Sequence, residues 1–385
     1  MRLFLSAGEA SGDALGAQLL ANLRLKNQDI QALGMGGELL RGQGLEVLKD
    51  SQEVAVFGLV EVVKHLPRLF RLVDELARRA IEARPDVAVL IDVPDFHIRL
   101  AKRLKAAGIP VVTYVGPSVW AWRPGRARRY APHIDRLLVL FPFELPIWRE
   151  ANVDVVHVGH PLADEISAPR PWSEADARVV SLLPGSRRSE VSRVFAPMLS
   201  AAERLVAEGI ADRFVVPVAP GLDEALVARP VAASPIRDRI ELVDGREPAS
   251  RRAAIARSAL ALLASGTISL EVALLGRPQI VTYRVNELTW RIARPMIQLE
   301  HVGLVNLIAG RGVAPELLQK DLTVDNLVRE AKRLLAPGAR SSVDAELAEV
   351  RARLLGVEGG ASGASARAAD AVLDLVSRRS RHADS

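Results

Sequence analysis

Several residue types and patterns are missing from the chain, and each absence excludes a class of site. There is no cysteine among the 385 residues, so disulfides, thiolate metal sites and cysteine nucleophiles are excluded. No stretch of about 18 uninterrupted apolar residues occurs, so we expect no membrane-spanning helix. The apolar run near Met1 is too short for a signal peptide and ends in glycine and acidic residues, so it predicts a first β-strand.

The composition is that of a globular protein with an aliphatic core. Apolar residues make up 49% of the chain and charged residues 25%, whereas aromatic residues make up only 4%. The formal net charge is +5, an excess that suits an anionic substrate or a membrane surface and is too small to indicate nucleic acid. The GxGxxG and GK[ST] patterns of dinucleotide and P-loop sites are also missing, which argues against a dehydrogenase or a Walker A protein.

Continuous Val/Ile/Leu runs alternate with helical segments in both halves of the chain. Such runs, rather than alternating ones, are typical of strands buried on both faces of a parallel sheet. The first set of predicted strands is 2–7, 86–92, 111–115, 136–140 and 153–158, and the second is 178–183, 214–218, 240–243, 260–264 and 279–282.

Two successive sets of βα units predict an α/β protein with two Rossmann-like domains facing each other across a cleft. We expect the first domain over 1–163 and the second over 164–355, with a proline-containing linker at 164–176. A last helix at 366–380 is expected to pack back on the first domain. Nucleotide-sugar transferases, epimerases, dehydrogenases and binding proteins share such folds, so the fold alone decides no function.

The segment GEASGD at 8–13 follows the first predicted strand directly. Glycines let the chain turn there, and the next helix offers free N–H groups to an anion or a sugar hydroxyl. Glu9, Ser11 and Gly12 are therefore candidate sugar-binding residues. The alternative is a tight βα turn in which Ser11 or Asp13 caps the helix.

Two carboxylates, Asp92 and Asp95, lie at the end of the second predicted strand of the first domain. Ligands bind at this end of parallel strands, and a pair of carboxylates can leave one as the base for a sugar hydroxyl. We favour Asp95 as the catalytic base, and its alternative role is to cap a helix that starts near Phe96. His97 is interpreted as a surface or packing residue, because no partner lies at metal-ligand spacing.

The segment PSVWAWR at 117–123 follows the next strand and carries two tryptophans. Ser118, Trp120 and Trp122 can form an apolar wall for an acyl or sugar ligand, and the arginines that follow supply positive charge. The alternative is that the indoles pack into the core.

The segment LLPGSR at 182–187 ends the first strand of the second domain. Gly185 and Ser186 can shape a turn whose N–H groups face a phosphate, and Arg187 can add a charge-assisted bond of about 1.5–3 kcal/mol. A plain turn is the alternative, and diphosphate binding is favoured because the position and the chemistry both suit it.

The segment LLASGT at 262–267 is a second turn of the same kind. Ser265, Gly266 and Thr267 offer hydroxyl and N–H groups, and Glu271, one helical turn later, can accept hydrogen bonds from ribose hydroxyls. The alternative is that Thr267 caps the helix and Glu271 is exposed.

Weaker signals come from single residues in later loops and from one apolar segment. Arg284, Asn306 and Arg311 can close the cleft, and His160, at the hinge, either contacts ligand or stabilises the linker. The segment 54–72 interleaves apolar and basic residues, so it is either a membrane-surface patch or a core-facing helix pair kinked at Pro67.

With these motifs assembled, the chain resembles the lipid-A-disaccharide synthase family of glycosyltransferases along nearly its whole length. The resemblance implies a two-domain GT-B architecture and a sugar site without metal or other cofactor. The matching segments, in order, are GEASGD at 8–13, PDF at 94–96, PSVWAWR at 117–123, GHP at 159–161, LLPGSR at 182–187 and LLASGT at 262–267.

By resemblance, the chain transfers 2,3-diacylglucosamine from UDP to the 6-hydroxyl of 2,3-diacylglucosamine 1-phosphate (lipid X), giving a β-1,6 disaccharide and UDP. Asp95 is then the general base and Arg187 a diphosphate ligand, while Asn306 matches a late active-site asparagine of the family. The resemblance also implies a cytoplasmic protein held peripherally at the inner face of the inner membrane, and chains that can dimerise.

The chain departs from the family at three positions: Gly116 replaces an expected serine, His97 the usual asparagine, and Val305 a common proline. These departures concern the acceptor side and the 303–306 loop. Two other classes of function remain open at this point. One is another nucleotide-sugar enzyme such as a UDP-N-acetylglucosamine 2-epimerase, and the other is a catalytically silent sugar-nucleotide or membrane-binding protein.

Overall fold

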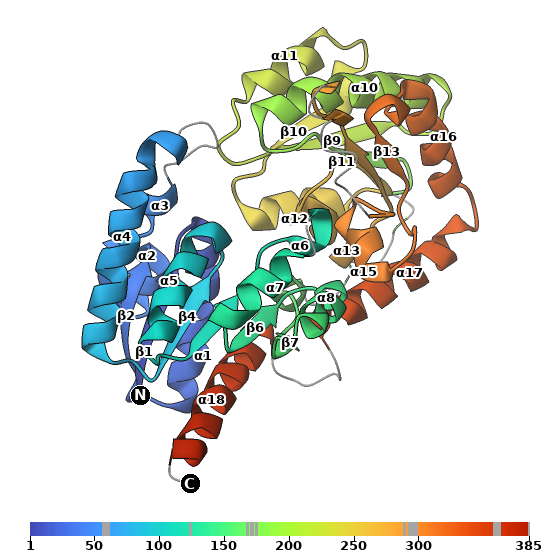
Figure 1. Cartoon of the computed structure of the whole chain (residues 1–385). Coiled ribbons are helices and arrows are strands. Elements are labelled where there is room, and N and C mark those ends of the chain that lie inside the picture. Colours follow the sequence, from blue (N-terminus) through green and yellow to red (C-terminus); the bar gives the residue numbers. More distant parts are fainter. Residues whose placement is uncertain are drawn as a thin grey trace. The chain divides into compact units, whose positions relative to one another are not determined.

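The computed structural model describes residues 1–55, 62–122, 125–166, 169, 173, 176–287, 290–291, 299–356 and 363–383, without the side chains of 55, 62–66, 121–122, 380 and 382–383. The chain divides into two compact units. The first comprises Met1–Pro161 and Leu355–Ser385, and the second Leu162–Leu354. Each unit is a parallel sheet with helices packed on it (Figure 1).

The sheet of the first unit has seven parallel strands in the order β3-β2-β1-β4-β5-β6-β7. Their bounds are β1 Arg2–Ala7, β2 Gln31–Gly36, β3 Glu46–Asp50, β4 Val87–Ile91, β5 Val111–Tyr114, β6 Arg136–Val139 and β7 Val155–His157. The five predicted strands of this half are present. β2 and β3 are two further strands that the sequence analysis missed.

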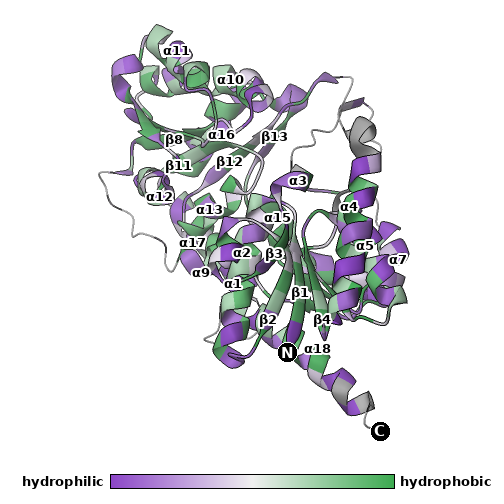
Figure 2. Ribbon diagram, turned by 90° about the vertical axis from the view of Figure 1, so that its left-hand side faces the viewer, coloured by the Kyte–Doolittle hydropathy of each residue, from purple (hydrophilic) through white to green (hydrophobic). Residues whose placement is uncertain are grey.

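Alternate residues of β1 point to opposite faces of this sheet, because successive side chains in a strand do. Leu3 and Leu5 join a core cluster that includes residues of α1 (Ala10–Lys26) and α18 (Ala364–Ala383), whereas Phe4 joins a second cluster with residues of α4 (Val62–Ala83) and α5 (Pro94–Ala106). Figure 2 shows the hydrophobic strands β1 and β4 between these helices.

The C-terminal helix α18 is an integral part of the first unit. It packs along α1, and the buried guanidinium of Arg136 on β6 donates to the carbonyl oxygen of Ala371 at 2.6 Å and pairs with Asp374 at 2.8 Å. The other helices of this unit are α2 Glu38–Gly42, α3 Gln52–Ala55, α6 Val119–Trp122, α7 Arg126–Tyr130, η1 Ala131–His133, η2 Pro142–Glu144, α8 Leu145–Glu150 and the start of α9 Pro161–Glu165.

The sheet of the second unit has six parallel strands in the order β10-β9-β8-β11-β12-β13. Their bounds are β8 Val179–Leu183, β9 Arg213–Val218, β10 Ile240–Asp244, β11 Leu260–Ala264, β12 Gln279–Tyr283 and β13 Glu316–Leu318. The helices are α10 Arg188–Ala207, α11 Ala225–Ala233, η4 Arg237–Arg239, α12 Pro248–Ala256, α13 Ile268–Leu274, α15 Leu304–Ala309, η6 Gln319–Asp321, α16 Val324–Leu335 and α17 Ala339–Leu355.

The prediction of two parallel-sheet α/β domains is therefore confirmed. Of the helices in the described residues, none combines the length and apolarity that crossing a bilayer requires. The segment 54–72 lies partly outside the described residues, because 56–61 are not among them. In its described part, Val54 and Leu72 are buried, and Phe70 on α4 is exposed.

Candidate functional site

The carboxyl ends of β8 and β11, which are neighbours in the second sheet, open onto a pocket of about 460 Å³. Both turns that the sequence singled out line it, and so does Glu271. Of the predicted nucleotide-binding residues, the ones that line this pocket are Gly185, Ser186, Arg187, Ser265, Gly266, Thr267 and Glu271, whereas Arg284 does not. The structure thus brings together two segments about 80 residues apart in sequence.

The first turn of this pocket depends on glycine at position 185. Gly185 has φ +105°, and a Cβ there would lie 2.6 Å from Oε2 of Glu190. That carboxylate accepts hydrogen bonds from the Ser186 N–H at 3.3 Å and from Nη1 of Arg187 at 3.1 Å. The Arg187 side chain is nevertheless 79% exposed, so its guanidinium can still reach an anion in the pocket.

The second turn is fixed by bonds that leave its polar groups facing outward. The Ser265 N–H donates to the carbonyl oxygen of Thr282 at 2.8 Å, and Oγ of Ser269 donates to that of Gly266 at 2.7 Å. Thr267 precedes α13, is exposed, and makes no capping bond with its side chain. A Cβ added at Gly266 would meet no atom within 4 Å, so this glycine borders open space.

Glu271 is buried and ion-paired, so the alternative in which it is exposed is wrong. Arg251 on α12 approaches its two carboxylate oxygens at 3.2 Å each, and Nε of Arg252 lies 2.9 Å from Oε1. Arg251 also lines the pocket. Arg251 was not predicted from the sequence. No motif in the sequence around it marks it, because its role comes from the packing of α12 beside α13.

The three late-loop candidates all have partners within the second unit. Arg284 donates to the carbonyl oxygens of Gln319 and Leu322, and Arg311 pairs with Glu349 at 2.9 Å. Asn306 is only 1% exposed. Whether these residues also contact ligand stays a prediction.

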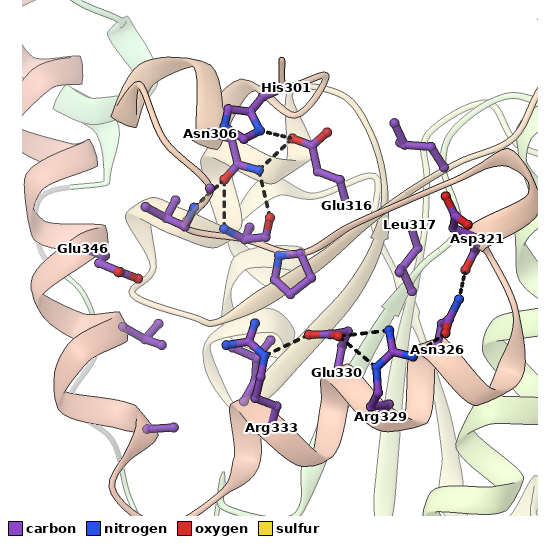
Figure 3. A pocket seen from close by; sticks show the side chains of 18 of the residues that line it. His301, Asn306, Glu316, Leu317, Asp321, Asn326, Arg329, Glu330, Arg333 and Glu346 are labelled. Atoms are coloured by element: carbon purple, nitrogen blue, oxygen red, sulfur yellow. Dashed lines mark hydrogen bonds and ion pairs between the residues drawn. The ribbon is translucent and has the colours of Figure 1, made fainter. Parts of the chain in front are cut away.

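The hydrogen bonds of Asn306 use all the capacity of its side chain, which is two donors and two acceptor positions. Its Oδ1 accepts from the N–H groups of Val313 and Ala314, and its Nδ2 donates to the carbonyl oxygen of Ala314 and to Glu316. Figure 3 shows Asn306 beside Glu316 and His301 at a pocket of about 790 Å³. The asparagine therefore holds the 303–316 loop in place.

In the first unit, the predicted residues at the ends of β1 and β4 lie close together. Oγ of Ser11 is 3.5 Å from Oδ2 of Asp92. Partial burial and, second, the charge of Asp92 raise the pKa of Glu9. A Cβ on Gly8 would lie 2.6 Å from Cγ2 of Val93, so glycine is required where these two strand ends meet.

The turn after β4 has an uncommon backbone. Asp92 and Val93 have φ +58° and +39°, a left-handed conformation that a β-branched residue rarely adopts. His97 is buried beneath this turn, with Nδ1 2.7 Å from the carbonyl oxygen of Asp92 and Nε2 2.9 Å from Oγ of Ser6. Burial lowers the pKa of His97 to about 4, so the ring is neutral at pH 7. Of the two predicted alternatives, a surface residue or a packing residue, His97 is the second.

Asp95 does not cap a helix, so the capping alternative is wrong: α5 begins at Pro94, with Val93 at the N-cap position. The Asp95 side chain is 75% exposed and points into a pocket of about 640 Å³. Its Oδ1 accepts from Arg126 at 2.6 Å and from the Tyr130 hydroxyl at 3.3 Å. Asp13 is a carboxylate that does cap a helix in this unit, because it accepts from the N–H groups at the start of α2.

Aromatic rings meet at the ends of β5 to β7. The rings of Trp120 and Phe143 are in edge contact at 5.1 Å, Phe143 stacks on Phe141 at 5.2 Å, and Phe141 lies 5.5 Å from the His160 ring. Trp120 and His160 are half-buried, and Ser118 is exposed nearby in sequence. The side chain of Trp122 lies outside the described ones. Phe141 and Phe143 were not predicted from the sequence, because no unusual motif marks the segment after their strand.

Within the described residues, no group of three or more His, Asp or Glu side chains has the arrangement of a metal site. The pocket at Gly185 and Gly266 and the pocket at Asp95 are lined instead by hydroxyls, carboxylates and arginines.

Two parallel α/β units with polar turns at their strand ends define the class of GT-B glycosyltransferases and the related epimerases. The fold is similar to a putative UDP-N-acetylglucosamine 2-epimerase from Listeria monocytogenes, with TM-score 0.64, 13% identity and 99% and 97% of the two chains covered. It is also similar to CalG4, the calicheamicin glycosyltransferase, with TM-score 0.62, 17% identity and 98% of each chain covered.

The sequence comparisons identify the family within this class. The model of the family described as lipid-A-disaccharide synthetase matches residues 3–368. A lipid-A-disaccharide synthase of Myxococcus xanthus is 42% identical over 384 residues, with 97% of each chain covered. The chain belongs to the lipid-A-disaccharide synthase family, a family of glycosyltransferases of lipid A biosynthesis, as the sequence motifs predicted. The epimerase and silent-protein alternatives are thereby disfavoured.

Proposed function

We propose that the chain catalyses an inverting transfer of 2,3-diacylglucosamine from UDP to the 6-hydroxyl of 2,3-diacylglucosamine 1-phosphate, with UDP as the second product. Membership of the family supports the reaction class. The observation that carries the proposal is the single pocket that joins the Gly185–Arg187 and Ser265–Thr267 turns with Glu271.

The second unit binds the UDP half of the donor. The exposed guanidinium of Arg187 and the hydroxyls of Ser186 and Thr267 bond the diphosphate and stabilise the charge that develops as UDP departs. Because these groups offset that charge, the reaction needs no metal or cofactor. Among the described residues, Arg251 is the one donor to Oε2 of Glu271, so this oxygen keeps room for a ribose hydroxyl.

The first unit supplies the base. Asp95 accepts the proton of the 6-hydroxyl as that oxygen attacks the anomeric carbon, and the bond to the diphosphate breaks on the opposite face. Arg126 and Tyr130 hold one oxygen of Asp95, which leaves Oδ2 to take the proton. The imidazole of His97 holds the turn that carries this base.

The remaining predicted contacts belong to the same proposal. The acceptor and donor sugars lie against Glu9, Ser11, Gly12, Ser118, Trp120, Trp122, His160 and Arg311, and Arg284 supports the nucleotide. Asn306 acts on the sugar site through the 303–316 loop that its side chain holds in place. Because its substrates carry acyl chains, the protein works peripherally at the inner face of the inner membrane. By the resemblance to the family, its chains can also pair as a homodimer.

The test is an assay with UDP-2,3-diacylglucosamine and 2,3-diacylglucosamine 1-phosphate, in which UDP and the disaccharide are followed together. Equal amounts of both products support the proposal. Conversion of the UDP-sugar without acceptor would indicate an epimerase instead, and UDP binding without turnover would indicate a binding protein.

A further inference from the structure

The pocket beside Asp95 in the first unit is rich in cations. It has a volume of about 640 Å³, and the residues that line it are Asp95, Ile98, Arg99, Lys102, Arg126, Arg129, Tyr130 and His133. Four of these side chains carry a fixed positive charge, and among the described lining residues Asp95 is the single carboxylate. The pocket therefore has a net charge of about +3 at pH 7.

The cations of this pocket come from two helical segments, α5 and the segment formed by α7 and η1. Asp95, Arg99 and Lys102 follow one face of α5, since residues three and four apart are neighbours on a helix. Arg126, Arg129 and His133 have the same spacing on α7 and η1. At 1.5 Å per residue, Lys102 lies about 10 Å along the axis from Asp95.

Most of the positive charge in this pocket is not neutralised by the part of the chain that the structure describes. Arg126 pairs with Asp95 at 2.6 Å. The next cations of α5 are also paired, because Arg103 lies 2.5 Å from Asp74 and Lys105 2.7 Å from Asp135.

For Arg99, Lys102 and Arg129, in contrast, no carboxylate within ion-pair distance is found in the described part of the chain. Desolvation and, after it, the charges of Lys102 and Lys105 lower the pKa of His133, which agrees with a positive potential at this surface. A pocket of this kind attracts a doubly charged anion.

One aromatic ring lies beside a cation of this pocket. The guanidinium of Arg99 lies 5.2 Å from the centroid of the Phe70 ring on α4, and Phe70 is 41% exposed. A ligand with an anionic group in the pocket could therefore rest an acyl chain beside this ring. This arrangement favours an amphiphilic phosphate over free inorganic phosphate.

We propose that this pocket binds the phosphate monoester of the acceptor, with Lys102 and Arg129 as the residues that select for it. The inference rests on the proposed function, in which the acceptor hydroxyl lies at Asp95. The phosphate is attached at the other end of the same sugar ring, so it falls within the reach of the cations one to two helical turns further along α5. A phosphate monoester carries nearly two negative charges, which the unpaired cations balance.

The test compares two acceptors, 2,3-diacylglucosamine 1-phosphate and the same sugar without phosphate. Lys102→Ala and Arg129→Ala are expected to raise KM for the phosphorylated acceptor about tenfold each. Neither kcat nor KM for the UDP-sugar should change much, and KM for the phosphate-free acceptor should stay as in the unmodified protein. Arg128→Ala is the matched control, because Arg128 is on the same helix, is exposed and faces Glu150 at 3.5 Å.

Equal changes of KM for both acceptors, or none for either, would overturn the pocket assignment and leave the proposed function intact. If the unmodified protein turns over neither acceptor, the proposed function fails. Calorimetry with glucosamine 1-phosphate then tests separately whether the pocket binds a phosphate monoester. The pocket assignment is supported if the Lys102→Ala/Arg129→Ala double variant loses this binding and Arg128→Ala keeps it. Equal binding by both variants overturns the assignment.

Vesicles of phosphatidylcholine with phosphatidylglycerol separate the acceptor from the membrane as the source of phosphate. If the double variant loses vesicle binding while KM for the acceptor stays unchanged, the pocket binds lipid headgroups, and the acceptor assignment is refuted.

Discussion

Nδ1 of His97 lies 2.7 Å from the carbonyl oxygen of Asp92, directly below the left-handed turn that leads to Asp95. The carbonyl can only accept, so Nδ1 carries the proton and Nε2 accepts from the Ser6 hydroxyl. A neutral imidazole thus ties β1 to the strained turn. The histidine fixes the main chain from which the proposed base projects.

His97→Ala is expected to destabilise the protein by about 1–3 kcal/mol, because it leaves buried polar groups unpaired. It should also lower kcat, whereas His97→Asn should recover part of both losses because the amide can donate to Asp92. Urea unfolding and steady-state kinetics measure the two effects. A loss of kcat that His97→Asn does not reduce would contradict a positioning role.

The same histidine predicts a pH dependence of stability. Its pKa in the folded protein is about 4, below the ordinary histidine value of 6.5, so the unfolded chain binds more protons between these pH values. Stability from this group is therefore present above pH 6.5 and is lost as pH falls toward 4, by up to about 3 kcal/mol. Urea midpoints at pH 4.5 and 7 should differ more for the unmodified protein than for His97→Asn, and equal differences would contradict this assignment.

Asp95→Asn should lower kcat by roughly 10²–10⁴-fold and leave UDP affinity unchanged, because the amide cannot take the proton. Tyr130→Phe tests the orientation of the base, since it removes one hydrogen bond to Oδ1 and keeps the ring. We expect Tyr130→Phe to lower kcat far less than Asp95→Asn. Turnover of Asp95→Asn at the unmodified rate would exclude Asp95 as the base.

The buried parts of both sheets could be predicted from sequence because their strands are continuous apolar runs, such as Leu260–Ala264. β2 was missed because glycines interrupt its run, QALGMG, and β3 because its sequence, EVLKD, is half polar at the sheet edge. β13 was not predicted either, because it has only three residues. A short or polar strand gains its stability from its neighbours, which the local sequence does not show.

The two turns that line the pocket at Gly185 and Gly266 could be predicted because each follows a predicted strand with glycine and hydroxyl residues. Their side-chain partners could not, because they come from other elements: Arg251 reaches Glu271 from α12, and Arg126 reaches Asp95 from α7. Asn306 could be singled out from the sequence, but its environment could not. Only the fold shows that the backbone of its own loop occupies its amide.

Arg187→Ala should weaken UDP binding by about 10- to 100-fold, because in the proposed function its guanidinium makes a charge-assisted bond to the diphosphate. Arg187→Lys should be intermediate, since it keeps the charge and loses the planar fork. The control is Arg188→Ala, whose side chain is equally exposed and lies 3.8 Å from Asp223. Calorimetry with UDP measures all three, and equal affinities for Arg187→Ala and Arg188→Ala would remove Arg187 from the nucleotide site.

The two pocket glycines should respond differently to alanine. Gly185→Ala forces a Cβ to within 2.6 Å of the Glu190 carboxylate at φ +105°, whereas Gly266→Ala places its Cβ in open space at an ordinary φ. We expect Gly185→Ala to destabilise the second unit by about 1–3 kcal/mol through backbone strain, and Gly266→Ala to change stability little. Thermal unfolding of both variants, without ligand, is the measurement.

Because the Gly185 turn also presents Ser186 and Arg187, Gly185→Ala should weaken UDP binding even at temperatures where it remains folded. Equal stability of the two variants would show that the glycine turn is not a structural requirement of the pocket.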